Sequence, residues 1–224
     1  MGAVLTDPDF GVATWIVIDF ETLTPAGRPP VPIEVAAIAG RFGQSGRWAE
    51  TGRFESLMRP PDDVPVTGFD RAQNGLSGPV LARQPPASQV MAALDTRLGS
   101  PPYRLVAHSA HTEATVIAGQ RQHCPVLAGT PMLCTVKLSR LAFPGLGSHR
   151  LDAVLGFLGI PIPPGRHRAM PDAELTVQVL QRALAAGHEK GLWSALKDLD
   201  AAAGITPRRA RTGDADGPVQ EPLF

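Results

Sequence analysis

The sequence predicts an α/β fold in which helices flank a mixed β-sheet. Three apolar, strand-like segments come first, and turns rich in Pro and Gly separate them. Segments with helical periodicity then alternate with short apolar runs along the rest of the chain. Strands that precede such an alternation indicate a sheet with both antiparallel and parallel pairs.

The first three strands are predicted at residues 15–23, 33–42 and 48–58. The segment TPAGRPPVP separates the first two, and GQSG is a turn between the second and the third, so an antiparallel meander is expected. A polar, proline-rich loop is expected over residues 59–86.

The second half of the chain is expected to alternate between helices and strands. Apolar residues at helical spacing predict helices over residues 88–98, 112–122, 151–158, 171–185 and 192–203. A short strand is predicted at residues 104–108. The run MLCTVKL, residues 132–138, fits either a buried strand or the start of a helix.

Composition indicates a globular protein. The chain has 224 residues, enough for one domain with a full core, and a hydrophobic fraction of 43%. Its 21 basic and 21 acidic side chains balance, so net charge alone favours no partner. Two cysteines without metal-type spacing, no leader-like N-terminus and no apolar run of membrane-spanning length predict a cytoplasmic protein without membrane association.

The chain is expected to divide into three parts. Residues 1–12 are predicted as an N-terminal extension, residues 13–204 as the main domain and residues 205–224 as a flexible tail. Within that tail, residues 206–219 lack periodicity and are predicted to be disordered.

Two carboxylates end the first predicted strand, TWIVIDFETLTP. Asp19 and Glu21 are two residues apart, so their side chains share a face of the strand and lie about 6.5 Å apart along it. One interpretation is a solvated strand end, or a pair neutralised by an arginine such as Arg28. The other is a divalent-metal site, because a hard cation relieves the repulsion and prefers oxygen ligands.

Further acidic residues favour the metal site. Glu113 follows the strand predicted at residues 104–108, and His167 lies five residues before Asp172 at the start of an amphipathic helix. Pro171 suits the first turn of that helix, where the helix dipole favours a carboxylate. Separated acids with a loop histidine are a pattern that a two-metal phosphodiesterase uses.

These motifs resemble the DEDDh group of 3′–5′ exonucleases, the family of the proofreading subunit of bacterial replicative DNA polymerase. The family's Asp-x-Glu-Thr is matched at residues 19–22, its second motif by VAHSAHTE and its His-x-x-x-x-Asp by residues 167–172. PIEVAAIAG resembles its second strand, and NGLSGPVLARQPP its segment before the first long helix. The resemblance covers about residues 13–186.

The resemblance implies a ribonuclease H-like fold with a mixed five-stranded sheet, and an exonuclease domain over residues 13–204. It implies two Mg²⁺ or Mn²⁺ ions held by Asp19, Glu21, Glu113 and Asp172. His167 would act as general base, Thr22 would seat the 3′-terminal nucleotide, and the product would be a nucleoside 5′-monophosphate.

The second motif departs from the family pattern. Glu113 stands where the family has aspartate, and its carboxylate reaches more than about 1 Å further, which affects a site that demands near-ideal geometry. Ser109 stands where the family often has asparagine. The alternatives are an active enzyme, with a small shift of the helix or a preference for Mn²⁺, and a non-catalytic binding module with a disabled site.

Other candidates near the motifs have two interpretations each. Arg166 and Arg168 flank His167 and are candidates for contacts with backbone phosphates, or belong to a solvated loop. His108 and His111 lack further ligands at zinc spacing, so His108 is predicted to be a hydrogen-bonded structural residue.

The chain ends in QEPLF, which resembles the bacterial sliding-clamp-binding peptide Gln-x-x-Leu-Phe. Gln220 would bond at the rim of the clamp groove, and Leu223 and Phe224 would fill its apolar pocket. A flexible linker of about 14 residues spans roughly 20 Å, enough for the nuclease to sample DNA beside the clamp. The alternative is a frayed terminus.

The predicted function is hydrolysis of phosphodiester bonds at DNA 3′ ends, in replication proofreading or repair. The sliding clamp is the predicted protein partner, and a DNA polymerase subunit is a further candidate. Trimming of RNA 3′ ends is the related alternative, because recognition of the 2′-hydroxyl depends on details of the pocket. A nucleic-acid- or clamp-binding module without activity is the alternative from a different class.

Overall fold

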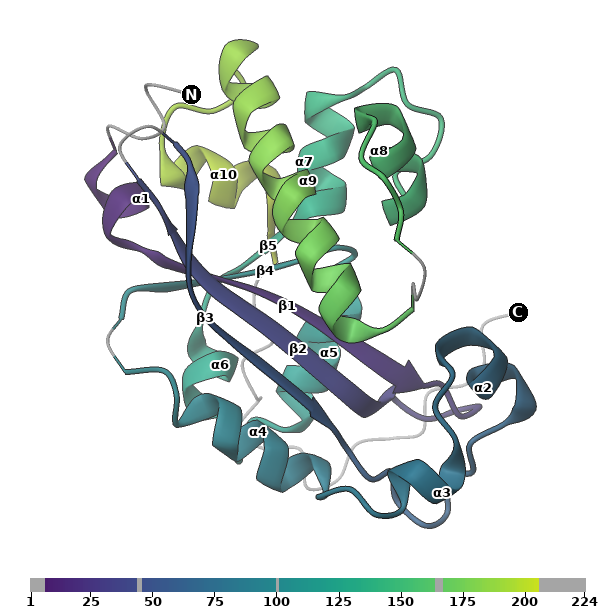
Figure 1. Cartoon of the computed structure of the whole chain (residues 1–224). Helices are drawn as coiled ribbons and strands as arrows, with labels where there is room; N and C mark the ends of the chain where they lie inside the picture. The colour runs from purple at the N-terminus through teal and green to yellow at the C-terminus, as the bar shows by residue number, and fades with distance from the viewer. Residues whose placement is uncertain (1–6, 44–45, 100, 164–166, 206–224) are drawn as a thin grey trace.

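A computed structural model describes residues 7–43, 46–99, 101–163 and 167–205. It confirms the predicted α/β fold, because helices cover both faces of one mixed sheet (Figure 1). The strands of the sheet are β1 Thr14–Leu23, β2 Val31–Phe42, β3 Trp48–Leu57, β4 Tyr103–Ala107, β5 Met132–Cys134 and β6 Gly204–Ile205.

The strands lie in the order β3-β2-β1-β4-β5-β6. The predicted antiparallel meander is present, since β2 pairs antiparallel with both β1 and β3. β4 runs parallel to β1, and β5 runs parallel to β4. The carboxyl ends of β1, β4 and β5 therefore meet at one edge of the sheet, where loops and helix starts converge.

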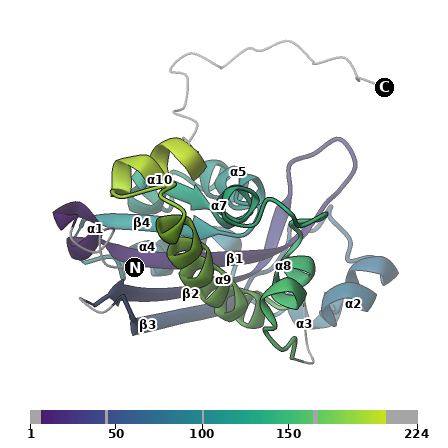
Figure 2. The same ribbon diagram turned by 90° about the horizontal axis from the view of Figure 1, so that it is seen from above.

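Ten helices occur in the described part of the chain. They are α1 Pro8–Val12, α2 Gly68–Asn74, α3 Gly78–Leu81, α4 Ala87–Asp95, α5 His111–Gly119, α6 Pro125–Gly129, α7 Thr135–Ala142, α8 Leu151–Leu158, α9 Ala169–Glu189 and α10 Leu196–Ala203. In Figure 1, α7 to α10 lie above the sheet, and α4, α5 and α6 lie below it. Figure 2 looks down on α8, α9 and α10.

Alternation along β1 divides the core into two layers. Trp15 and Val17 are buried in the cluster formed with α7, α9 and α10, whereas Ile16 is buried with α4, α5 and α6. Because strand side chains alternate between faces, Asp19 and Glu21 continue the row of Trp15 and Val17. The strand thus presents both carboxylates on the face that α9 covers.

The structure differs from the sequence prediction in several elements. The sheet has a sixth strand, β6, whose two residues pair with β5. The expected loop at residues 59–86 contains α2 and α3, and the ambiguous run at residues 132–138 divides into β5 and the start of α7. The helix predicted at residues 171–185 extends over Ala169–Glu189, because buried apolar side chains continue along its length.

Residues on both sides of the predicted main domain pack against it. Phe10, in the predicted N-terminal extension, is 1% exposed, and its ring lies 4.9 Å from that of Trp15. Ile205, in the predicted tail, pairs with Met132 in the sheet. The remainder of the predicted tail lies outside the described residues.

No helix among the described residues combines the length and hydrophobicity that a membrane span requires. Both cysteines, Cys124 and Cys134, are buried and free.

Candidate active site

Three carboxylates converge at the carboxyl end of β1. Ligand oxygens of Asp19, Glu21 and Asp172 all lie within 4.8 Å of one another. Two come from adjacent same-face positions of β1, and the third comes from the first turn of α9, 151 positions further along the chain from Glu21. The structure thus brings together three of the four metal ligands that the sequence predicts.

The carboxylate cluster is not a solvated strand end. Glu21 and Asp172 are buried, and Asp19 is half-buried. Arg28, the alternative partner for the pair, binds Asp63 instead at 2.7 Å. Among the described residues, this is the one group of three or more His, Cys, Asp or Glu side chains close enough to share a metal ion.

A β-bulge lies next to the cluster. Glu21 of β1 pairs with Glu34 of β2, but Thr22 pairs with Pro32, so β2 has one extra residue at this point. Bulges occur often beside active sites, where they redirect a side chain. Thr22 is half-buried at this point, and its contact with a terminal nucleotide stays a prediction.

A buried ion pair fixes the start of α9. Glu34 on β2 is fully buried and lies opposite Glu21 in the register of the sheet. The Arg168 side chain donates to both Glu34 oxygens, through Nε at 3.0 and 2.9 Å and through Nη2 at 2.6 Å. The backbone N–H of Ala169 donates to Glu34 as well, at 3.1 Å. These bonds tie the N-terminus of α9, and with it Asp172, to the sheet.

The role of Glu34 is not among the predictions from the sequence, which place Arg168 against phosphate or solvent. In the structure, the Arg168 guanidinium is engaged with Glu34. A signal was present, because Glu34 is the one charged residue in the apolar run VPIEVAAIAG, and a buried charge requires a partner. A phosphate contact by Arg168 stays a prediction, and Arg166 lies outside the described residues.

Glu113 lies in the first turn of α5 and is 4% exposed. Its Oε2 has no hydrogen-bond partner among the described residues. Burial raises the pKa of the Glu113 carboxyl to about 8, and the negative charge of Glu21 adds to the increase. The Glu113 carboxyl therefore lies close enough for the charge of Glu21 to raise its pKa. It is not one of the three groups whose oxygens lie within 4.8 Å of one another.

The raised pKa of Glu113 predicts how the stability of the metal-free protein depends on pH. A carboxyl whose folded pKa exceeds its unfolded value of 4.5 stabilises the fold below pH 4.5, and this contribution is lost as the pH rises through about 8. The free energy of unfolding of the native protein should therefore fall over this range, by on the order of 5 kcal/mol. With a chelator present, Glu113→Gln should abolish this fall. Urea unfolding at several pH values measures it.

Glu189→Gln, at an exposed position near the end of α9, is the matched control for this substitution. If the stability of Glu113→Gln falls with pH in parallel with the native protein, then Glu113 is not the group responsible.

His167 lies in the turn before α9 and is exposed. Its φ is 64°, and Ser109, in the turn between β4 and α5, has the same value. These are the two non-glycine residues with positive φ in the described part of the chain, and such strain often accompanies functional sites. The general-base role of His167 remains a prediction.

His108 is a structural residue, as predicted. Its Nε2 lies 3.1 Å from the backbone carbonyl of His149, which can only accept, so Nε2 carries the proton. Its Nδ1 lies 2.9 Å from Oγ1 of Thr135, at the start of α7. His108 thereby joins β4, α7 and the loop before α8.

The family of the chain follows from the comparison with family models. The model described as Exonuclease matches residues 16–180, a stretch that contains all three carboxylates, Glu113 and His167. The chain therefore belongs to the exonuclease family, which confirms the predicted class of enzyme.

The chain is similar to several curated proteins whose names refer to DNA polymerase III. A PolC-type DNA polymerase III of Bacillus cereus is 28% identical over 179 residues, which cover 80% of this chain and 12% of that protein. A DNA polymerase III subunit epsilon-like protein of Rhodobacter capsulatus is 28% identical, over 85% of this chain and 26% of its own length. The DNA polymerase III subunit epsilon of Aquifex aeolicus is 27% identical and is covered over 80% of its length. The chain thus spans only a small part of the first two relatives.

Solved structures confirm the fold. A structure of exonuclease X with 5′-overhanging duplex DNA aligns with a TM-score of 0.59 and 22% identity, over 84% of this chain and 98% of the other. The nuclease domain of 3′hExo, a DEDDh family member bound to rAMP, aligns with a TM-score of 0.65 and 18% identity, over 81% and 96%. The ribonuclease H-like fold is therefore the one predicted.

The residues at the cluster fit a divalent cation. Carboxylate oxygens are the ligands that hard cations such as Mg²⁺ and Mn²⁺ prefer, and three of them already converge here. The partnerless, buried Oε2 of Glu113 is a further oxygen donor beside them. Like charges at this spacing repel, so a cation would remove a cost that the fold otherwise bears.

Proposed function

We propose that this chain is a metal-dependent 3′–5′ exonuclease that removes nucleoside 5′-monophosphates from DNA 3′ ends. The convergence of Asp19, Glu21 and Asp172 within 4.8 Å, inside a chain of the exonuclease family, carries the proposal. The similarity to DNA polymerase III subunits favours DNA as substrate and proofreading or repair as role.

In this proposal, Asp19, Glu21 and Asp172 would hold two divalent ions, Mg²⁺ or Mn²⁺, and Glu113 would be the fourth ligand. Bound divalent ions would neutralise the carboxylates and stabilise charge on the phosphate. His167 accepts a proton from the attacking water, whose oxygen bonds to the terminal phosphorus. The bond from phosphorus to the 3′-oxygen of the preceding nucleotide breaks, and that oxygen leaves with the shortened strand.

Contacts within the fold would hold the proposed catalytic groups in place for this reaction. The Glu34–Arg168 ion pair anchors the turn that carries His167 next to the helix that carries Asp172. Burial of the carboxylates strengthens their attraction for any cation that binds there. Thr22, at the bulge, is the proposed contact for the terminal nucleotide.

The substrate class is tested with single-stranded DNA and RNA of the same sequence, in Mg²⁺ and in Mn²⁺. We expect nucleoside 5′-monophosphates to be released faster from DNA. Faster release from RNA would assign the chain to trimming of RNA 3′ ends. If the native protein is silent and Glu113→Asp is active, then the chain is a binding module with a disabled site.

We also propose that the C-terminal residues Gln220, Leu223 and Phe224 bind a bacterial sliding clamp. These residues lie outside the described part of the chain, so the proposal rests on their sequence alone. Deletion of residues 220–224 should abolish binding to an immobilised clamp, measured by surface plasmon resonance. Binding that survives the deletion would contradict the clamp motif. A polymerase subunit as partner and a cytoplasmic location remain predictions.

A further inference from the structure

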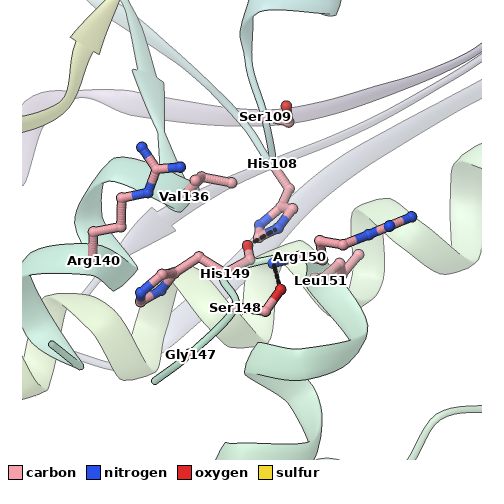
Figure 3. A pocket seen from close by; sticks show the side chains of 9 residues that line it. All are labelled: His108, Ser109, Val136, Arg140, Gly147, Ser148, His149, Arg150 and Leu151. Carbon is pink, nitrogen blue, oxygen red and sulfur yellow. Dashed lines mark hydrogen bonds between the residues drawn. The ribbon is translucent and has the colours of Figure 1, made fainter. Parts of the chain in front are cut away.

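A pocket outside the carboxylate cluster is lined in part by polar side chains. It has a volume of about 670 Å³ and is formed by the β4–α5 turn, α7 and the loop before α8. Its polar lining consists of His108, Ser109, Arg140, Ser148, His149 and Arg150 (Figure 3). This volume is typical of pockets that bind small organic ligands, including those of the size of a nucleotide.

The pocket shares one segment with the candidate active site, namely the β4–α5 segment that also carries Glu113. Ser109 lies four residues before Glu113, in the turn that follows β4. β4 is parallel to β1, so this turn emerges at the edge of the sheet where Asp19 and Glu21 lie. A strand whose 3′ end occupies the carboxylates can therefore continue toward this pocket.

Arg140 and Arg150 give the pocket its charge. Both are exposed, and no carboxylate of the described residues lies within 4.0 Å of either guanidinium. Arg53 and Arg168, in contrast, each bind glutamates. Asp152, the acidic residue closest in sequence to Arg150, does not line the pocket. Figure 3 shows the two arginines on opposite sides of His108.

The loop that carries Arg150 is held in place. The carbonyl of His149 accepts from His108 at 3.1 Å, and Nδ1 of His149 lies 3.0 Å from Oγ of Ser139 on α7. Burial and the nearby charge of Arg140 lower the pKa of His149, so its ring is neutral at pH 7. The two arginines thus flank a loop that these hydrogen bonds hold in place.

The opposite flank of the site has the opposite charge. Glu50 and Glu55 on β3 and Glu174 on α9 lie on the β3 side of the sheet, and Arg53 binds two of these three. A phosphate backbone is repelled there and attracted to a flank with unpaired arginines.

From this asymmetry we infer that the Arg140–Arg150 pocket binds backbone phosphates of the nucleic-acid strand, on the 5′ side of the bond that is cleaved. The inference rests on the proposed function, since it assumes that the 3′ end occupies the carboxylates. The guanidinium groups donate to phosphate oxygens, and the hydroxyls of Ser109 and Ser148 are further donors for the strand.

The test compares Arg140→Gln/Arg150→Gln with the native protein on two substrates. One is a single-stranded oligodeoxynucleotide, and the other is the p-nitrophenyl ester of thymidine 5′-monophosphate, which has no upstream phosphates. We expect kcat/KM on the oligonucleotide to fall roughly tenfold relative to that on the ester. The dependence of oligonucleotide binding on salt should also weaken, by about 0.7 in log–log slope per lost phosphate contact.

Arg47→Gln is the matched control, since Arg47 is exposed in the β2–β3 turn, at the other end of the sheet. An equal loss on both substrates, or no loss on either, would overturn the inference. If the native protein cleaves neither substrate, the proposed function fails. Fluorescence anisotropy of a labelled oligonucleotide then still decides the pocket, because equal affinity of the native and double-variant proteins refutes it.

Discussion

Asp172→Asn is expected to reduce cleavage of single-stranded DNA on the order of a thousandfold, because the charge stabilisation by a metal is worth several kcal/mol. The amide keeps the shape of the side chain but removes the charge that the cluster offers a cation. Asp19→Asn should act in the same way, since its carboxylate lies within 4.8 Å of Asp172 and Glu21. Steady-state cleavage rates in Mn²⁺, with calorimetric titration of Mn²⁺, measure both effects.

The matched control is Asp152→Asn, in the first turn of α8 rather than of α9. Its position relative to a helix start resembles that of Asp172, but it is not part of the carboxylate cluster. If Asp172→Asn cleaves DNA at the native rate, or binds Mn²⁺ as the native protein does, then the carboxylate cluster is not the metal site of the reaction. The double variant Asp19→Asn/Asp172→Asn should lose little more than either single variant, since both disable one unit.

The second large effect is expected on stability. Arg168→Gln leaves Glu34 fully buried without its ionic partner, and breaking one side of a buried pair costs about 3–5 kcal/mol. The double variant Arg168→Gln/Glu34→Gln should recover part of this loss, because no uncompensated charge stays buried. Urea unfolding of the two single variants and the double variant gives the coupling energy.

Arg53→Gln provides the contrast, because the ion pairs of Arg53 with Glu50 and Glu174 are exposed. Such pairs contribute about 0–1 kcal/mol. If Arg168→Gln is no more destabilising than Arg53→Gln, then Glu34 does not anchor α9. Activity of Arg168→Gln should also fall about 10- to 100-fold, since residues that orient the groups of a metal site have effects of this size.

Local patterns in the sequence were sufficient to predict the centre of the site. Asp19 and Glu21 share a face because strand side chains alternate, and this needs no tertiary information. The helix that carries Asp172 was likewise visible from its apolar periodicity. That Asp172 meets the β1 pair was implied by the family resemblance and by no spacing, since the two segments are joined only in the fold.

The missed features depend on long-range contacts or on very short elements. The Arg168–Glu34 pair joins residues 134 positions apart, and nothing local to either residue specifies the partner. β6 has two residues, too few for an alternation to be recognised. The helix α2 could have been predicted, because Thr67 and Asp70 form a capping box that the sequence shows as T-x-x-D.

The direction of cleavage is tested with one DNA strand labelled at either end, in Mn²⁺. A 3′–5′ exonuclease converts the 5′-labelled strand into a ladder of progressively shorter fragments. The 3′-labelled strand then releases its label at once as a nucleoside 5′-monophosphate. We predict this pair of results for the native protein and neither for Asp172→Asn. A ladder from the 3′-labelled strand, or identical products from Asp172→Asn, would contradict the account.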